Sequence, residues 1–180
     1  MSEAAAQGVI QTECVIVGAG PVGLFAVFEL GLLGIKCHIV DSLAHPGGQC
    51  TELYPDKPIY DIPALPVCAQ ELIDRLMQQI KPFDAGFHLG EEVVEVARQA
   101  SGRFDVRTAA GTRFDAGSLI IAGGLGSFQP RRLMVPDADR FEGRQVHYRV
   151  RRAEEFHGRD VVVAGGGDSA LDWVLNLQPI

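Results

Sequence analysis

The chain has 180 residues, of which 47% are hydrophobic and 22% are charged, and its formal net charge at pH 7 is −7. These values are typical of a core-forming soluble protein, and the acidic balance argues against nucleic-acid binding. No apolar run approaches the ~20 residues that span a bilayer, and the first residues lack the basic and apolar regions of a signal peptide. We therefore expect a cytoplasmic protein.

A glycine-rich turn follows the first apolar run, Cys14–Val17, and precedes an apolar stretch that predicts a helix over Val22–Leu33. In this setting one glycine permits the tight turn, a second lets backbone N–H groups approach a diphosphate, and a third lets the helix press against the strand. The positive end of the helix dipole then faces the anion. The residues predicted to bind this first nucleotide are Gly18, Gly20, Pro21 and Gly23.

A second predicted strand, Cys37–Val40, ends at Asp41, which lies 18 residues after Gly23. A carboxylate at this place accepts hydrogen bonds from ribose hydroxyls and repels a 2′-phosphate, so the site suits FAD or NAD better than NADP. The alternative is a tight turn with no ligand. It is less favoured because strand, helix and acid are all present.

A long loop follows Asp41 and contains a pair of glycines, Gly47 and Gly48. Loops of such length inside a compact domain are often functional. Gly48 would allow close backbone approach to a ligand, while Gln49 and Tyr54 offer polar and aromatic contacts.

The four cysteines show neither metal-ligand spacing nor a Cys-x-x-Cys pair, so no metal site is predicted. We expect buried thiols. The alternative is a reactive Cys50 beside the glycine loop, which would need a lowered thiol pKa.

The middle of the chain predicts one amphipathic helix over residues 72–80 and then three short alternating segments. The segments are Glu92–Arg98, Arg103–Thr108 and Thr112–Asp115, which read as a small antiparallel meander. An apolar run, Ser118–Ala122, follows and is typical of a buried parallel strand. The pattern predicts an α/β fold, with a parallel sheet interrupted by a three-stranded antiparallel crossover.

The glycine turn recurs 147 residues after its first copy, behind the apolar run Val161–Val163. A second nucleotide is therefore expected, with alanine in the third place as in the variant often seen for NADP. The residues predicted to bind it are Gly165, Gly167, Asp168 and Ser169. One strand and one helix cannot bury a core by themselves, so we expect the second domain to be truncated and the chain to be part of a longer enzyme.

Three segments, residues 47–61, 124–131 and 165–173, resemble motifs of the thioredoxin-reductase-like (type 2) ferredoxin/flavodoxin–NADP(+) reductases. The resemblance runs from Glu13 to Ile180. It implies two dinucleotide-binding (Rossmann-like) domains of the flavoprotein disulfide reductase type. The FAD-binding domain would occupy residues 10–124, and residues 125–180 would form a linker and the start of the NADPH-binding domain.

By this resemblance Asp41 would bind the adenosine ribose, Gln49 would contact the flavin, and Tyr54 would stack on the isoalloxazine ring. Phe128 would line the same site and Val93 would meet the adenine, while the second turn would hold the diphosphate of NADPH. Each of these side chains also has a purely structural alternative: Tyr54 as a loop anchor, Gln49 as a turn residue, and Phe128 and Val93 as core.

The resemblance implies a homodimeric flavoprotein that moves a hydride from NADPH to FAD and then single electrons to ferredoxin or flavodoxin. Thioredoxin reductases carry a redox Cys-x-x-Cys before the second turn, and this chain has none, so the electrons would pass directly to the carrier. Eight arginines against five acids between Arg131 and Arg159 could steer an acidic carrier, or could form a solvated surface. No catalytic side chain is predicted.

Two other functions stay open at this point. The first is a flavin-dependent thiol/disulfide-type reductase that lacks its own dithiol and acts on a separate partner. The second is a truncated, non-catalytic nucleotide-binding fragment. The 180-residue chain alone is expected to be inactive.

Overall fold

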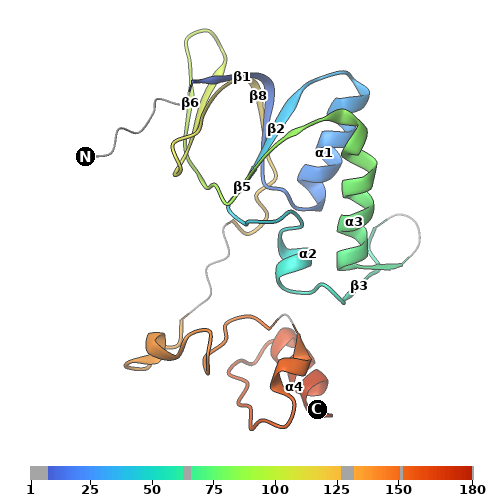
Figure 1. Ribbon diagram of the computed structural model, residues 1–180, viewed down its shortest axis with the longest axis vertical. Coiled ribbons are helices and arrows are strands. Elements are labelled where there is room, and N and C mark those ends of the chain that lie inside the picture. The colour runs from blue at the N-terminus through green and yellow to red at the C-terminus, as the bar shows by residue number, and fades with distance from the viewer. Residues whose placement is uncertain (1–7, 63–65, 127–131, 151, 180) are drawn as a thin grey trace. The chain divides into compact units, whose positions relative to one another are not determined.

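The computed structural model describes residues 8–62, 66–126, 132–150 and 152–179. The chain divides into two compact units, Met1–Gln129 and Pro130–Ile180. The first unit contains a six-stranded sheet in the order β5-β2-β1-β8-β7-β6 (Figure 1). Its strands are β1 (Ile10–Val17), β2 (Cys37–Asp41), β5 (Gly86–Leu89), β6 (Val93–Arg98), β7 (Phe104–Thr108) and β8 (Arg113–Ile121).

Two helices, α1 (Pro21–Leu32) and α3 (Ala69–Ile80), pack together beside the parallel strands (Figure 1). α3 buries Ile73, Leu76 and Ile80, whose spacing places them on one face of the helix, as the sequence predicted. They pack with Leu24 of α1 and with alternate residues of β1 and β2. This core fixes the direction of α1 relative to the strand that precedes it.

The second cluster of buried residues joins the parallel strands to the antiparallel ones. Val15 and Val40 of β1 and β2 pack with Val106, Phe114 and Ala116 of β7 and β8. The predicted crossover is therefore present.

One detail of the prediction is wrong, because the third meander segment and the parallel strand form a single strand, β8. Residues 113–116 of β8 form an antiparallel pair with β7. Residues 114–121 form a parallel pair with β1. Gly117 lies within β8, and a Cβ there would lie 3.0 Å from the carbonyl oxygen of Glu13. The glycine permits close approach of two strands and makes no turn.

Three short elements lie in the loop after β2, namely α2 (Gln49–Glu52), β3 (Pro58–Ile59) and β4 (Val67–Cys68). The edge strand β5 was not predicted, and it pairs in parallel with β2. Its four residues, Gly86–Leu89, show no alternation of buried and exposed positions, so a periodic pattern could not reveal it.

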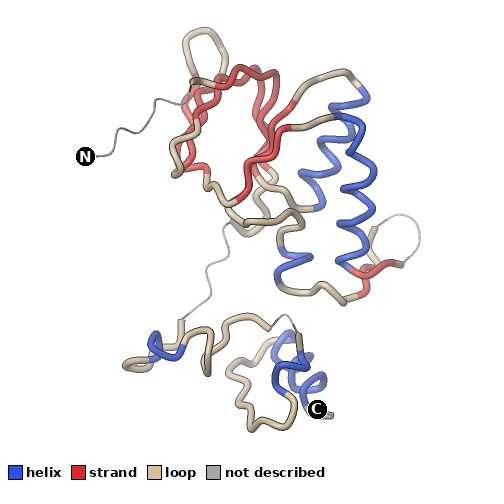
Figure 2. Tube along the Cα trace, in the orientation of Figure 1, coloured by secondary structure: helices blue, strands red, loops and turns tan. Residues whose placement is uncertain are grey.

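The second unit contains α4 (Asp168–Leu177) and two 3-10 helices, η2 (Ala138–Phe141) and η3 (Ala153–Phe156). The strand predicted at Val161–Val163 is wrong: the described residues between 132 and 179 contain no strand (Figure 2). Val162 is 93% exposed. An isolated segment has no neighbouring strand to pair its amides, so the apolar run forms no regular element.

Among the residues that the structure describes, no helix has the length and apolar character needed to cross a membrane.

Candidate functional site

The first glycine turn lies where the carboxyl ends of three parallel strands meet. The Gly18 N–H donates to the carbonyl of Val40 at 2.8 Å, and the Ala122 N–H donates to the carbonyl of Val17 at 2.7 Å. Gly18 has a φ of +108°, and a Cβ there would lie 2.3 Å from the carbonyl oxygen of Ala122. Only glycine fits this turn, as the sequence predicted.

α1 begins directly against the turn because Gly23 has no side chain. A Cβ at Gly23 would lie 1.9 Å from the carbonyl oxygen of Gly18. Pro21 occupies the start of the helix, its first turn carries no acid, and no side chain in the described part of the chain caps it. The first amides and the positive dipole end of α1 are therefore left for an anion.

The side of Gly20 on which a Cβ would stand is open. A Cβ built on Gly20 would meet no described atom within 4 Å, and the residue has an ordinary extended backbone. The glycine is thus not required by the packing of the protein itself. Close backbone approach of a diphosphate to Gly20 stays a prediction.

Asp41 holds its carboxylate against the same turn. Its Oδ2 accepts from the Ala19 N–H at 2.6 Å, and its Oδ1 accepts from the Leu43 N–H at 2.8 Å. A carboxylate has about four acceptor positions, so hydroxyl groups of a ribose can still donate to it. The predicted acid and the predicted turn are therefore brought together.

The glycine pair after β2 lies against the first glycine turn. The Gly47 N–H donates to the carbonyl of Ala19 at 2.8 Å, and a Cβ on Gly48 would lie 3.2 Å from the Cα of Gly20. Gly47 and Gly48 have φ of +121° and +56°, which favour glycine. The Nε2 of Gln49 lies 3.2 Å from where a Cβ of Gly124 would stand. Gly48 and Gln49 thus reach the turn and the end of β8.

A buried acid that the sequence analysis missed anchors this loop. Glu52 is 2% exposed, and its Oε1 lies 2.7 Å from the Nε2 of His45. The two residues are seven apart in an irregular loop, so no periodic signal could have paired them.

The remaining predicted contacts lie on other segments. Tyr54 follows α2, and the ammonium of Lys57 lies 5.1 Å from the centre of its ring. Val93 begins β6 and packs against the second core cluster. Their contacts with flavin and adenine stay predictions, and Phe128 lies outside the described residues.

Of the thiols near the site, that of Cys37 is buried and that of Cys50 is partly buried. Burial, with a smaller effect of Cys14, raises the pKa of Cys37 to about 11. Burial also raises the pKa of Cys50, so a reactive thiol at this position is not supported. No cluster of His, Cys, Asp and Glu in the described part of the chain could hold a metal ion.

Only part of the second glycine turn has the expected geometry. Gly167 precedes α4, and a Cβ on Gly165 would lie 3.1 Å from the Cβ of Ala170. Unlike Gly18, Gly165 has no positive φ. Asp168 occupies the first turn of α4. Contacts of Asp168 and Ser169 with a nucleotide stay predictions.

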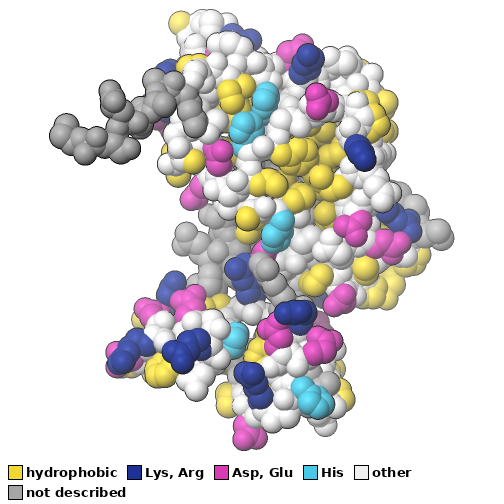
Figure 3. All heavy atoms as spheres, viewed as in Figure 1, with side chains coloured by type: hydrophobic (Ala, Val, Ile, Leu, Met, Phe, Trp, Pro, Cys, Tyr) yellow, Lys and Arg dark blue, Asp and Glu magenta, His cyan; other side chains and the backbone are white. Residues whose placement is uncertain are grey.

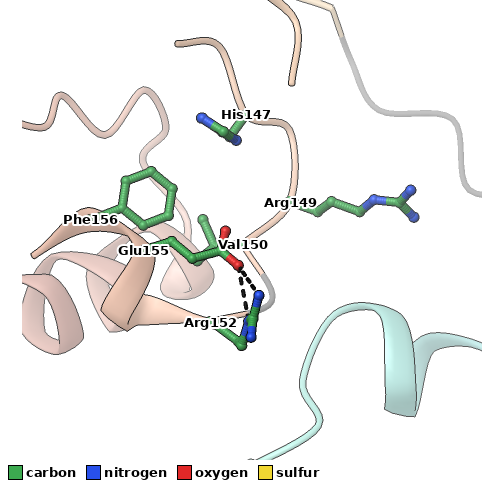
Figure 4. Close-up of a pocket in the computed structure, with 6 residues that line it drawn as sticks. All are labelled: His147, Arg149, Val150, Arg152, Glu155 and Phe156. Carbon is green, nitrogen blue, oxygen red and sulfur yellow. Dashed lines mark hydrogen bonds and ion pairs between the residues drawn. The ribbon is translucent and has the colours of Figure 1, made fainter. Parts of the chain in front are cut away.

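The second unit has a hollow of 450 Å³, and no residue of this turn lines it. Figure 4 shows the six residues that do. Arg152 pairs with Glu155 inside it at 2.8 Å, and the ring of His147 meets Phe156 edge-on at 5.1 Å. The side chain of Arg149 points away from the other five (Figure 4). Because the nearest cation is already paired, the hollow lacks the convergent donors of a phosphate site. Its lining residues are His147, Arg149, Val150, Arg152, Glu155 and Phe156.

The sequence profile of the pyridine nucleotide-disulphide oxidoreductases matches residues 12–177. The chain belongs to this family. Among curated relatives, ferredoxin–NADP reductase of Methylibium petroleiphilum is 65% identical over 94% of this chain, and ferredoxin–NADP reductase 2 of Cupriavidus metallidurans is 62% identical over 93%. The chain covers 46% of each of these relatives and so spans less than half their length.

Solved structures with the same fold include cyclohexanone monooxygenase from Rhodococcus sp. Phi1 bound to NADP+. The match has a TM-score of 0.71 and 21% identity, and it covers 96% of this chain and 37% of the other. At this identity the likeness shows the fold alone. The resemblance and the α/β, Rossmann-like fold expected from the sequence are both confirmed.

Two glycines of this oxidoreductase turn provide a matched pair of tests. Gly23→Ala should lower the free energy of unfolding by about 1–3 kcal/mol, because its methyl group collides with a carbonyl. Gly20→Ala should change that free energy by less than about 1 kcal/mol and weaken nucleotide binding at least ten-fold. Denaturant unfolding and nucleotide titration measure both. Equal loss of stability in the two variants would contradict the assignment.

The imidazole of His38 on β2 is expected to make the stability of the fold depend on pH. His38 Nδ1 lies 2.9 Å from His88 Nε2, and both rings pack against Phe114. Burial, with a smaller effect of His88, lowers the pKa of His38 below 6.5. The unfolded chain then binds a proton at His38 more tightly than the folded chain does. The contribution of His38 to the free energy of unfolding is therefore fully present above about pH 6.5 and is lost as the pH falls below that value.

His38→Gln should therefore reduce the loss of unfolding free energy between pH 6.5 and 5. Urea unfolding across this range measures the slope, and His157→Gln at an exposed site of the other unit serves as the substitution control. An unchanged slope in His38→Gln would show that this imidazole does not govern the response.

Proposed function

We propose that this chain is part of a flavoprotein reductase that moves a hydride from NADPH to FAD and then single electrons to ferredoxin or flavodoxin. The observation that carries the proposal is the convergence of the first glycine turn, Asp41 and the Gly48–Gln49 loop at one edge of the sheet. The named function of the relatives that match 93–94% of this chain supports the choice of reaction.

In this proposal FAD binds the first unit through groups that fit its successive parts. The first amides of α1 hold the diphosphate, Asp41 accepts from the ribose, and Val93 lies beside the adenine. Gln49, Tyr54 and Phe128 contact the flavin. The FAD-binding domain comprises residues 10–124, and residues 125–180 form a linker and the start of the NADPH-binding domain, with its diphosphate at Gly165, Gly167, Asp168 and Ser169.

The chemistry that a bound flavin supplies is acceptance of a hydride and release of single electrons. The protein contributes placement: it orients the ring, excludes water and brings the nicotinamide within reach. The sequence holds no Cys-x-x-Cys pair to relay electrons, which favours direct transfer to a one-electron carrier over thiol reduction.

In this proposal the arginine-rich stretch from Arg131 to Arg159 attracts an acidic carrier, but among its described residues much of the charge is locally balanced. Arg132 pairs with Asp139 at 2.7 Å and with Glu142 at 3.0 Å. Basic and acidic side chains are interspersed over this unit (Figure 3). Electrostatic attraction of an acidic carrier to this stretch is therefore weaker than the number of arginines alone suggests. We also propose a homodimer, which the resemblance implies, and a location in the cytoplasm, as expected from the composition of the sequence.

The test is an absorbance spectrum of the full-length gene product with FAD, followed by anaerobic titration with NADPH. The flavin band should bleach with NADPH and recover when oxidised ferredoxin or flavodoxin is added. A band that NADPH leaves unchanged would reject the reaction. Recovery with a disulfide substrate but with neither carrier would favour the thiol-reductase alternative. The 180-residue chain alone should not turn over.

A further inference from the structure

The segment between β5 and β6 ties the end of β2 to the rest of the sheet, and Glu91 lies at its centre. The Glu91 N–H donates to the carbonyl of Asp41 at 2.9 Å, and the Gly90 N–H donates to the carbonyl of Leu43 at 2.8 Å. Leu43 in turn donates its N–H to Asp41 Oδ1 at 2.8 Å. Residues 90 and 91 therefore hold the backbone of Asp41 and of Leu43, the residue whose N–H binds the Asp41 carboxylate.

The side chain of Glu91 locks that segment in place. Thr108, which is 4% exposed, donates its hydroxyl to Glu91 Oε2 at 2.7 Å and accepts from the Thr112 N–H at 3.1 Å. The other oxygen, Oε1, lies 3.9 Å from His88 Nδ1. One carboxylate thus connects β5 with the turn between β7 and β8.

The charge of this carboxylate is maintained by its surroundings. Burial alone would raise the pKa of Glu91, but hydrogen bonds from Thr112 and Thr108 and the neighbouring His88 together lower it. An ionised acceptor makes a stronger hydrogen bond with Thr108 than a neutral one would. The connection is therefore firm at neutral pH.

Both residues assigned to the adenosine end of the site depend on this segment. Asp41 is hydrogen-bonded to it, and Val93 follows Glu91 by two residues at the start of β6. We propose that Glu91 is a positioning residue, which acts through Asp41 and fixes it so that it binds the adenosine half of FAD. The inference rests on the proposed function, because it requires FAD at the first glycine turn.

The test is a double-mutant cycle on FAD affinity, measured by quenching of flavin fluorescence as FAD is added to the full-length apoprotein. Glu91→Ala and Asp41→Asn should each weaken binding about ten-fold, as expected for the loss of one charge-assisted hydrogen bond. If Glu91 acts through Asp41, the double variant should bind little worse than Asp41→Asn alone. Glu91→Gln keeps an acceptor for Thr108 and should restore most of the affinity.

Glu95→Ala is the matched control, because Glu95 is an exposed acid on β6 whose ion pair with Arg107 lies on the surface. It should bind FAD as the wild type does. If Glu91→Ala does not fold in a thermal unfolding scan, Thr108→Val removes the hydroxyl donor instead and should give the same non-additive loss.

The outcomes separate this inference from the proposed function. A wild type that binds FAD, with effects of Glu91→Ala and Asp41→Asn that simply multiply, would overturn the positioning role alone. Unchanged affinity in Glu91→Ala would do the same. A wild type that does not bind FAD would overturn the proposed function, and the inference with it.

Discussion

The site depends on one close approach, that of Gly23 to the carbonyl of Gly18. A Cβ at Gly23 would lie 1.9 Å from that oxygen, so α1 can start against the end of β1 only when this position carries no side chain. The buried contacts of Leu24 and α3 then hold the helix in the same direction. Its uncapped amides consequently face the carboxyl edge of the sheet, where open parallel sheets bind ligands.

A positive group and a negative group both lie at this turn. The dipole of α1 favours an anion, while Asp41, fixed by the Ala19 and Leu43 amides, presents acceptors. A dinucleotide carries both a diphosphate and ribose hydroxyls, so one ligand satisfies both groups. The acid can stand beside the anion site because backbone hydrogen bonds keep its carboxylate in a fixed orientation.

Much of this arrangement could be predicted from the sequence, because glycine positions and apolar periodicity report local constraints. The turn, α1, α3 and Asp41 were located in this way. Contacts that depend on the folded sheet or loop could not be predicted in this way. Glu91 meets Asp41 and Thr108, and Glu52 meets His45, only after the sheet and loop have formed. Val161–Val163 has the composition of a strand, yet pairing requires a neighbour that composition cannot supply.

In the proposed function, main-chain amides at the start of α1 bind a diphosphate. The most direct measurement is the backbone amide NMR spectrum of the isotopically labelled protein during titration with ADP, which carries the adenosine and diphosphate alone. The account predicts the largest shifts at Ala19, Gly20, Val22 and Gly23, with smaller changes near Asp41 and Gly48. Saturable shifts that leave these amides unaffected and lie elsewhere would contradict it.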